Sequence, residues 1–268
     1  MCQPRYHDII IVMEPIQIRI FGKPLDIRLT GNSVSLPQDL QAKVESHWQN
    51  LLTKNPKLRN GEVFTVNSVN EDIGSIYIRL DETNYSHYLY SRQVGDLGKY
   101  TVRIIHPAAL VISSDNKMIF GSMGQQTALP RIIQCCGGGI DRRAVGANGT
   151  ITIDDTMNAE LAEELGLIPH DKRIVSMTPA YLKFGGSTGK MTLVYVVNLN
   201  VTSEQFEQDY KTFIQSLKTK GEEPEFDEIF CIDKDVVAVD TFIDQHKNRL
   251  NEYMAVLLRT VSAEKIDK

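Results

Sequence analysis

Segments with strand-like patterning alternate with amphipathic helical segments along this chain. In the first helical segment, for example, Leu40, Val44 and Trp48 recur at the spacing of one helix face. Helices are expected at residues 36–54, 155–167, 203–218 and 239–261, and strands at residues 9–12, 16–20, 26–29, 64–69, 75–80, 108–113, 117–121, 132–136, 174–177, 191–197 and 228–232. This alternation favours a layered α/β or α+β fold with a mixed sheet over a helix bundle or a β-sandwich.

The pattern changes near residue 100. Residues 1–100 hold one expected helix among short strands, and residues 70–74 join two of these strands as a hairpin. Residues 101–268 hold a second hairpin, the other helices and an expected loop at 178–190. A chain of 268 residues is long enough for two small domains. We therefore expect a small N-terminal α+β domain at residues 1–100 and a larger α/β domain at residues 101–268.

Charge and hydropathy narrow the choice of partners. Hydrophobic residues make up 42% and charged residues 24%, which is typical of a globular protein. A formal net charge of −5 argues against binding to DNA or to an anionic membrane, so a phosphate substrate would need a metal ion or a local basic cluster. No run approaches the roughly 20 apolar residues that span a bilayer. Residues 9–13 lack the length and the cleavage site of a secretory signal.

The cysteines indicate a reducing compartment. The chain has four of them, Cys2, Cys135, Cys136 and Cys231, and no pair has CxxC spacing. That arrangement is neither a disulfide framework nor a zinc site. Free thiols in the cytoplasm are therefore expected.

Three glutamates carry the chemistry that the sequence indicates. Glu160, Glu163 and Glu164 lie at positions i, i+3 and i+4, so their side chains share one face of the expected helix. Like charges this close repel each other, and a divalent cation removes that repulsion. The glycines at 137–139 allow the backbone to approach a ligand closely. A solvated acidic face is the alternative, but the glycine run and Gly166 at the helix end favour a site for Mg²⁺ or Mn²⁺.

The glycines and the acidic helix together resemble the signature of the Nudix hydrolases. That signature is Gly, five residues, Glu, seven residues, Arg-Glu, an aliphatic residue, any residue, Glu-Glu, any residue, Gly and an aliphatic residue. Residues 160–167 (ELAEELGL) match its second half, and residues 138–141 (GGID) look like its opening. The lead-in at 132–136 and the order of the later elements are also similar to this family. The resemblance implies a Nudix-type α/β/α sandwich with a mixed sheet over residues 101–268.

Two positions depart from the signature. Ala159 stands where the family has Arg, and Ile151 stands where it has Glu. In the family this pair mainly braces the loop against the helix, so its loss affects loop geometry more than metal binding. Because both members are absent together, no unpaired charge is left behind. Residues 83–89 (TNYSHYL) and the strand before them look weakly like the leader domain of the Nudix branch that cleaves uridine diphosphate sugars.

The resemblance implies a Mg²⁺-dependent hydrolase, with Mn²⁺ as the other candidate metal. Its substrate would be a nucleoside diphosphate linked to another moiety, such as a nucleotide sugar or a dinucleotide, cleaved at the pyrophosphate bond. Glu160, Glu163 and Glu164 are then catalytic residues and metal ligands, and Gly138 lies at the metal. One of these glutamates, or a carboxylate from residues 222–228, takes the proton of the attacking water, and family analogy favours Glu164.

Five further residues are expected to bind substrate: Gly139, Arg142, Arg143, Lys183 and Phe184. The two arginines lie in a loop longer than the family's and can reach phosphates as bidentate donors, although a solvated loop is the alternative. Residues 183–190 look like a phosphate-cradling loop but lack its Gly-x₄-Gly-Lys-Ser/Thr pattern, so we interpret them as a loop on the substrate side. Phe184 is a candidate for stacking on a base, or it is core.

Two other functions and an oligomeric state complete the expectations. The departures at Ala159 and Ile151 favour a Nudix-folded module that binds a nucleotide without cutting it. An isomerase of isoprenoid diphosphates would use a Cys and a Glu, and Cys135 or Cys136 lies near the right region without a recognisable pattern around it. His106, next to a proline, is expected to be a loop histidine without a partner. A homodimer is plausible for this family, and the long amphipathic helices leave room for it.

Overall fold

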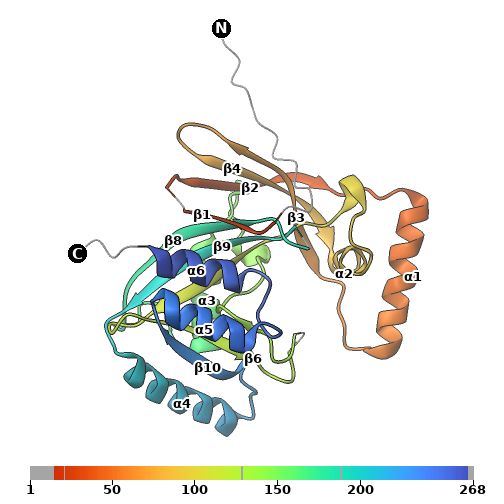
Figure 1. Ribbon diagram of the computed structural model, residues 1–268. Helices are drawn as coiled ribbons and strands as arrows, with labels where there is room; N and C mark the ends of the chain where they lie inside the picture. The colour runs from red at the N-terminus through yellow and green to blue at the C-terminus, as the bar shows by residue number, and fades with distance from the viewer. Residues whose placement is uncertain (1–14, 21, 128, 188, 265–268) are drawn as a thin grey trace.

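A computed structural model describes residues 15–20, 22–127, 129–187 and 189–264 of the chain. Strands and helices alternate along it, as the sequence predicts (Figure 1). None of the helices in these residues has the length and apolar character to cross a membrane. The strands are β1 (Gln17–Ile20), β2 (Leu25–Ser33), β3 (Glu62–Glu71), β4 (Ile76–Asn84), β5 (Ile105–Ile112), β6 (Lys117–Met123), β7 (Ile133–Gln134), β8 (Ile174–Phe184), β9 (Met191–Leu199) and β10 (Phe226–Asp233). The helices are α1 (Gln38–Lys54), α2 (Tyr85–Val94), α3 (Ile153–Leu165), α4 (Ser203–Lys220), α5 (Val236–His246) and α6 (Met254–Ala263).

The larger sheet is mixed. In the described part of the chain it has seven strands in the order β1-β8-β9-β5-β6-β10, with β7 paired to β6. β5 and β9 run parallel, and the other paired strands of this sheet run antiparallel. β5 is buried along nearly its whole length, which explains why its sequence is a continuous apolar run and does not alternate.

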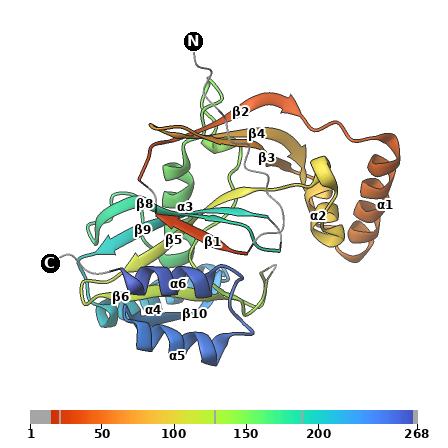
Figure 2. The ribbon, with the colours of Figure 1, turned by 45° about the horizontal axis from the view of Figure 1, so that its top comes forward.

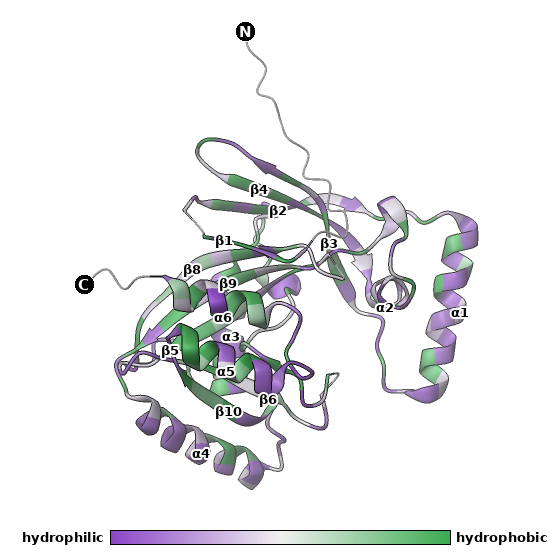
Figure 3. Cartoon of the chain, in the orientation of Figure 1, coloured by the Kyte–Doolittle hydropathy of each residue, from purple (hydrophilic) through white to green (hydrophobic). Residues whose placement is uncertain are grey.

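Helices cover both faces of this sheet. One apolar cluster, which includes Met157, Leu161 and Phe206, joins α3 and α4 to one face. A second cluster, which includes Phe242 and Leu257, joins α5 and α6 to the other face. Figure 2 shows α5 and α6 together on their face, and Figure 3 shows that hydrophobic residues are frequent in α5 and in the strands of the sheet. The predicted α/β/α sandwich with a mixed sheet is confirmed by these layers.

A smaller sheet lies in the N-terminal part of the chain. Among the described residues it has three strands in the order β2-β4-β3, with β2 parallel and β3 antiparallel to β4. Helices α1 and α2 pack against each other, and the Trp48 ring meets the Tyr85 ring edge-on with centroids 6.4 Å apart. β1 pairs with β8 of the larger sheet. The division into domains at residues 1–100 and 101–268 stays a prediction.

The last expected helix, at residues 239–261, is interrupted. It consists of α5 and α6 with a non-helical segment between them. In that segment the Asn251 N–H donates to the Ile133 carbonyl at 2.9 Å, and the Ile133 N–H donates to the Arg249 carbonyl at 2.7 Å. The segment thus bridges to β7, and these backbone bonds replace those of a continuous helix.

The loop expected at residues 178–190 is wrong over its first half, because β8 continues to Phe184. Pro179 weakens the strand signal in the sequence. It lies at a register shift between β8 and β9, a place where the missing N–H is tolerated. Only the residues after Phe184 form the connection to β9.

Three further differences concern the N-terminal part. Helix α2 was not expected, and its start is capped by the Asn84 side chain, which accepts a hydrogen bond from the His87 N–H at 3.0 Å. Residues 31–33, which the sequence did not mark as strand, lie inside β2, where Gly31 adopts a positive φ of 80°. The strand expected at residues 9–12 lies outside the described residues.

Candidate functional site

The acidic face of α3 lies directly against the glycines that precede it. The Gly137 N–H donates to Glu164 Oε2 at 2.8 Å. A Cβ atom at position 138 would overlap the Glu160 carboxylate, so only glycine leaves room for this close approach. The structure therefore brings together three members of the predicted site, Gly138, Glu160 and Glu164.

Burial makes both of these carboxylates hard to ionise. The Glu164 side chain is 2% exposed, and burial raises its pKa well above the ordinary value, against the hydrogen bonds from Cys136 and Gly137. Burial and then the charges of Glu225 and Glu163 raise the pKa of Glu160 to about 7. Neither Glu160 nor Glu164 forms a salt bridge with a described residue. The site thus concentrates negative charge that nothing nearby fully neutralises.

Two exposed glutamates add to this charge. Glu163 lies on the exposed side of α3, and Glu225 lies in the loop before β10. Both act on Glu160 by charge repulsion, and Glu225 acts on Glu164 as well. Glu225 belongs to the acidic run at residues 222–228. The sequence predicted a candidate carboxylate in this run but did not identify the residue.

The donor set fits a hard divalent cation whose remaining ligands come from outside the protein. Among the described residues, no group of three or more His, Cys, Asp or Glu side chains is arranged to hold a metal ion by itself. Mg²⁺, however, is usually held by one or two protein carboxylates, with waters and substrate phosphates completing its shell. Glu160 and Glu164 provide two such carboxylates, and their raised pKa values show that the folded protein places them there at an energetic cost.

A cavity of about 450 Å³ lies beside the glycine segment. Residues 137–141 form part of its wall, and β3 and α2 of the N-terminal part form another. Lys183 at the end of β8, Lys190 before β9 and the segment before α6 supply polar groups. Two predicted substrate-binding residues, Gly139 and Lys183, therefore line this cavity.

The other predicted substrate-binding residues lie elsewhere. Arg142 forms ion pairs with Glu62 and Glu82 of the smaller sheet, and Arg143 pairs with Asp141. Phe184 lies under the Arg19 guanidinium, whose carbon is 5.1 Å from the ring centroid, and lines a separate hollow at the edge of the sheet. Lys183 and Phe184 are neighbours in β8, so their side chains point to opposite faces of the sheet.

The ion pairs of Arg142 belong to a set of contacts that hold the long loop before α3. The Ile151 N–H donates to the Ile27 carbonyl at 2.9 Å, and the Leu29 N–H donates to the Gly149 carbonyl at 2.9 Å. Arg142 Nε donates to Glu62 Oε2 at 2.8 Å. The smaller sheet therefore holds the loop through these contacts, which the sequence pattern did not reveal.

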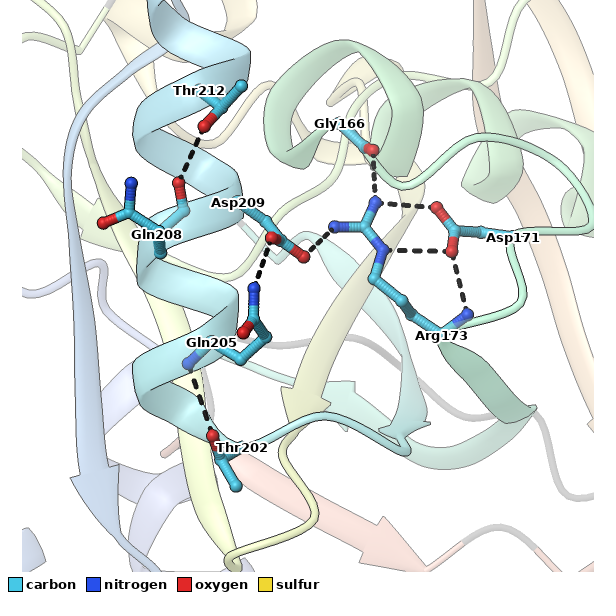
Figure 4. Close-up of polar contacts among 8 residues, drawn as sticks. All are labelled: Gly166, Asp171, Arg173, Thr202, Gln205, Gln208, Asp209 and Thr212. Carbon is cyan, nitrogen blue, oxygen red and sulfur yellow. Dashed lines mark hydrogen bonds and ion pairs between the residues drawn. The ribbon is translucent and has the colours of Figure 1, made fainter.

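The far end of α3 is also tied down (Figure 4). Gly166 ends the helix in the left-handed conformation, with φ of 66°, and its carbonyl accepts a hydrogen bond from Arg173 Nη2 at 2.9 Å. The same guanidinium pairs with Asp171 at 2.7 Å and with Asp209 of α4 at 2.9 Å. Arg173 therefore fixes the end of the acidic helix relative to α4.

Sequence reasoning missed two polar residues of the cavity, His106 and Glu252. His106 was expected in a loop, but it lies in β5, with Nε2 3.5 Å from Thr192 Oγ1 of β9. Glu252 was not singled out, although its Oε1 accepts a hydrogen bond from the buried Lys183 Nζ at 2.9 Å. The only available signal was a lone histidine at the start of an otherwise apolar strand. Glu252 lies 69 positions from Lys183, and no motif links the two.

The thiols give no support to isomerase chemistry. Cys135 and Cys136 are buried, at 1% and 0% exposed. Burial raises the pKa of Cys135 to about 12 and that of Cys136 well above its ordinary value. A thiol in such surroundings is inert as a nucleophile or metal ligand.

Comparison with known proteins gives relatives by structure only. No protein-family model matches the sequence, and no curated protein matches it. The protein DR0079 from Deinococcus radiodurans is 13% identical and has a TM-score of 0.41, with 59% of this chain and 83% of that chain covered. A NUDIX hydrolase from Nitrosomonas europaea is 13% identical and has a TM-score of 0.33, with coverage of 58% and 85%.

A third similar structure is a bifunctional NMN adenylyltransferase/ADP ribose pyrophosphatase from Francisella tularensis, complexed with AMP and a Mn ion. It is 11% identical and has a TM-score of 0.38, with 64% of this chain and 44% of that chain covered. Nudix hydrolases are thus among the solved structures to which this chain is similar, as expected from residues 138–167. Identities of 11–13% and TM-scores of 0.33–0.41 carry no argument about the function of this chain.

Proposed function

We propose that the chain is a Mg²⁺-dependent hydrolase of the Nudix type. Its substrate is a nucleoside diphosphate linked to another moiety, a nucleotide sugar or a dinucleotide, which it cleaves at the pyrophosphate bond. One observation carries this proposal: Glu160 and Glu164 are held against the glycines at 137–138 with raised pKa values and no salt-bridge partner among the described residues. A cation brought by a diphosphate relieves that unfavourable charge.

In this proposal each part of the site has one task. Glu160 and Glu164 hold the cation, and the bare backbone at Gly138 keeps the space beside Glu160 open. Bound Mg²⁺ supplies neutralisation of phosphate charge and a more acidic water. The proton of the attacking water goes to Glu163 or Glu225, both exposed, or to Glu160 or Glu164.

Variants that replace one carboxylate by its amide test these roles. In a panel of nucleotide sugars, dinucleotides and nucleoside triphosphates with Mg²⁺, the wild type should release phosphate-containing products from at least one compound. Glu164→Gln should lower kcat by a factor of about 100 or more, because the change removes the charge and keeps the volume. Full activity in both Glu160→Gln and Glu164→Gln would discard the site. Arg259→Ala, which removes an exposed ion pair with Asp240, is the matched control.

The base is identified by separating binding from turnover. Mg²⁺ and substrate together should raise the melting temperature of the wild type. If a glutamate only holds the cation, its Gln variant should no longer show this rise. A glutamate that only accepts the proton keeps this rise and loses kcat. Glu163→Gln and Glu225→Gln, which alter exposed side chains, can be compared directly.

A nucleotide sensor is the second candidate, and Ala159 and Ile151 favour it because the family's brace is missing. The smaller sheet holds the same loop through Ile27, Leu29 and Arg142, which argues for a geometry suited to turnover. Micromolar binding of a nucleotide diphosphate, without turnover of any compound in the panel, would decide for the sensor.

The proposal extends to the location and assembly of the protein. A cytoplasmic location agrees with the free thiols of Cys135, Cys136 and Cys231. The domain boundary near residue 100 and a homodimer are part of the same proposal. Light scattering at micromolar concentration tests the dimer, and limited proteolysis tests the boundary.

A further inference from the structure

The segment that carries Glu225 is held at two consecutive backbone carbonyls. The Gly124 N–H donates to the Glu225 carbonyl at 2.7 Å. The Tyr210 hydroxyl of α4 donates to the Phe226 carbonyl at 2.8 Å, in a buried position. The Glu225 side chain itself is exposed. The carboxylate therefore extends from a backbone that two other parts of the chain hold in place.

A β-bulge follows directly after Glu225. The pairing of β10 with β6 shifts register between Phe226 and Glu228, which leaves Asp227 as an extra residue in β10. Phe226 is 0% exposed, and a Cβ atom at Gly121 would overlap its ring. A bulge bends its strand and changes the direction in which nearby side chains point. The packing of Phe226 thus fixes the bend at the residue next to Glu225.

Tyr210 adjoins both this segment and the acidic helix. Its side chain is 5% exposed, and it shares one apolar cluster with Phe226 and with residues of α3. Burial and then the charges of Glu164 and Asp227 raise the pKa of Tyr210. The hydroxyl therefore stays protonated at neutral pH and acts as a donor close to a buried glutamate of the site.

The same helix also fixes the end of the acidic helix. A Cβ atom at Gly166 would lie 2.7 Å from the Phe213 ring, so this ring packs directly on the end of α3. Asp209 pairs with Arg173, which in turn donates to the Gly166 carbonyl (Figure 4). Helix α4 thus contacts both acidic elements, α3 through Phe213 and Asp209 and the segment before β10 through Tyr210.

The hydroxyl of Tyr210 is not needed to fill this space. The ring centroids of Phe206 and Phe213 lie 6.5 and 6.0 Å from that of Tyr210. A phenylalanine would pack there equally well, without the cost of burying a hydroxyl. The hydroxyl adds one directed bond, and its acceptor is the carbonyl of the residue after Glu225.

We propose that Tyr210 is a positioning residue, which sets the place of the Glu225 carboxylate relative to Glu160 and Glu164 through the Phe226 carbonyl. The charge of Glu225 acts on both of these glutamates, so the three carboxylates form one set. The inference rests on the proposed function, in which this set acts on the cation and its water. It adds that α4, which carries none of the three, determines their spacing.

A double-mutant cycle tests whether Tyr210 acts through Glu225. On a compound that the wild type turns over, Tyr210→Phe should lower kcat by about tenfold and change KM by less than about threefold, because the carboxylate is misplaced. Glu225→Gln should lower kcat by at least as much. The double variant should match Glu225→Gln within about twofold. Losses that multiply in the double variant, or wild-type kcat in either single variant, overturn the inference.

Tyr181→Phe is the matched control for the lost hydroxyl. It removes the bond from the Tyr181 hydroxyl to Glu264 Oε2 at 2.6 Å, in the apolar cluster on the other face of the sheet. It should keep the wild-type kcat. Equal losses of kcat in Tyr181→Phe and Tyr210→Phe would show a general effect of a weakened core and contradict positioning.

Glu225→Asp decides the question if Tyr210→Phe does not fold. This change keeps the charge and withdraws the carboxylate by one methylene group, so kcat should fall by about tenfold. Glu204→Asp, at an exposed position of α4, is its control and should not change kcat. Wild-type kcat in Glu225→Asp would show that the place of this carboxylate does not matter.

Binding of Mn²⁺ separates a failure of this inference from a failure of the proposed function. Electron paramagnetic resonance with Mn²⁺ alone should show about threefold weaker binding in Glu225→Gln and in Tyr210→Phe, and no further weakening in the double variant. That pattern without turnover of any compound supports the role of Tyr210 and removes the hydrolase. Turnover that depends on Glu160 and Glu164 but not on Glu225 or Tyr210 leaves the proposed function standing and removes this inference. A wild type that neither binds Mn²⁺ nor turns over any compound removes both.

Discussion

Replacing Glu160 by Gln should stabilise the metal-free protein. Its pKa is about 7 in the folded protein, against an ordinary value of 4.5. The folded state therefore binds this proton more tightly than the unfolded state does. The ionised carboxylate destabilises the fold increasingly as the pH rises from about 4.5 to 7, and the effect is complete above that range. At about 1.4 kcal/mol for each pH unit between the two pKa values, the destabilisation at pH 8 is about 3 kcal/mol.

Urea denaturation in EDTA measures this difference. At pH 8, Glu160→Gln should exceed the wild type by about 2–3 kcal/mol, which corresponds to about 5–10 °C in melting temperature. At pH 5 the advantage should fall below about 1 kcal/mol, because this pH is only slightly above the ordinary pKa of 4.5 and little of the destabilisation has developed there. Raising the salt concentration should reduce the part that comes from Glu225 and Glu163.

Two further observations complete the test. Glu223→Gln changes the net charge equally at an exposed loop position, so it should move stability by less than about 0.5 kcal/mol. Saturating Mg²⁺ with a nucleotide should narrow the gap at pH 8, since the cation offsets the wild-type repulsion. Two results would refute the view that Glu160 is held in an electrostatically unfavourable place. Glu160→Gln would be less stable than the wild type at pH 8, or its gain in stability would be the same at pH 5 and pH 8.

Three other changes test the framework around this site. Gly138→Ala should place a methyl group on the Glu160 carboxylate and lower kcat by about 100-fold with the fold intact, as measured by steady-state kinetics and circular dichroism. Arg142→Ala frees the loop from the smaller sheet and should lower kcat by about tenfold with a smaller change in KM and a small loss of stability. Arg173→Ala removes charged hydrogen bonds at the end of α3 and should lower the free energy of unfolding in urea by about 2 kcal/mol.

The exposed Arg259–Asp240 pair supplies the control for both arginine variants, and Arg259→Ala should change stability by less than about 0.5 kcal/mol. Wild-type kcat in Gly138→Ala would show that the space beside Glu160 is not needed. An Arg142→Ala variant with unchanged kcat would show that the loop needs no support from the N-terminal part. If Arg173→Ala and Arg259→Ala were equally stable, the contacts of Arg173 at the end of α3 would not stabilise the fold more than an exposed ion pair does.

Much of the fold could be predicted because the signals are local. Helix periodicity gave α3 and α4 to within about three residues, and the turn sequences at residues 70–74 and 114–116 marked both hairpins. The interruption of the last helix and the presence of α2 could not be predicted from local signals. The interruption between α5 and α6 depends on Ile133, which lies more than a hundred residues upstream and pairs with Asn251. Helix α2 was hidden because its aromatic residues have weak helical propensity, and tertiary contacts such as Trp48 with Tyr85 override that preference.

The sequence by itself determined that an acidic helix would follow a glycine turn. Glu160 and Glu164 are four residues apart, and residues at that spacing share one face of a helix. Only the tertiary structure decided how deeply each carboxylate is buried and that a distant sheet would hold the loop through Arg142. It alone brought His106, Lys183 and Glu252 to one cavity from three separate segments. Spacing along a chain fixes which side chains share a face, whereas desolvation and long-range pairing depend on which segments pack together.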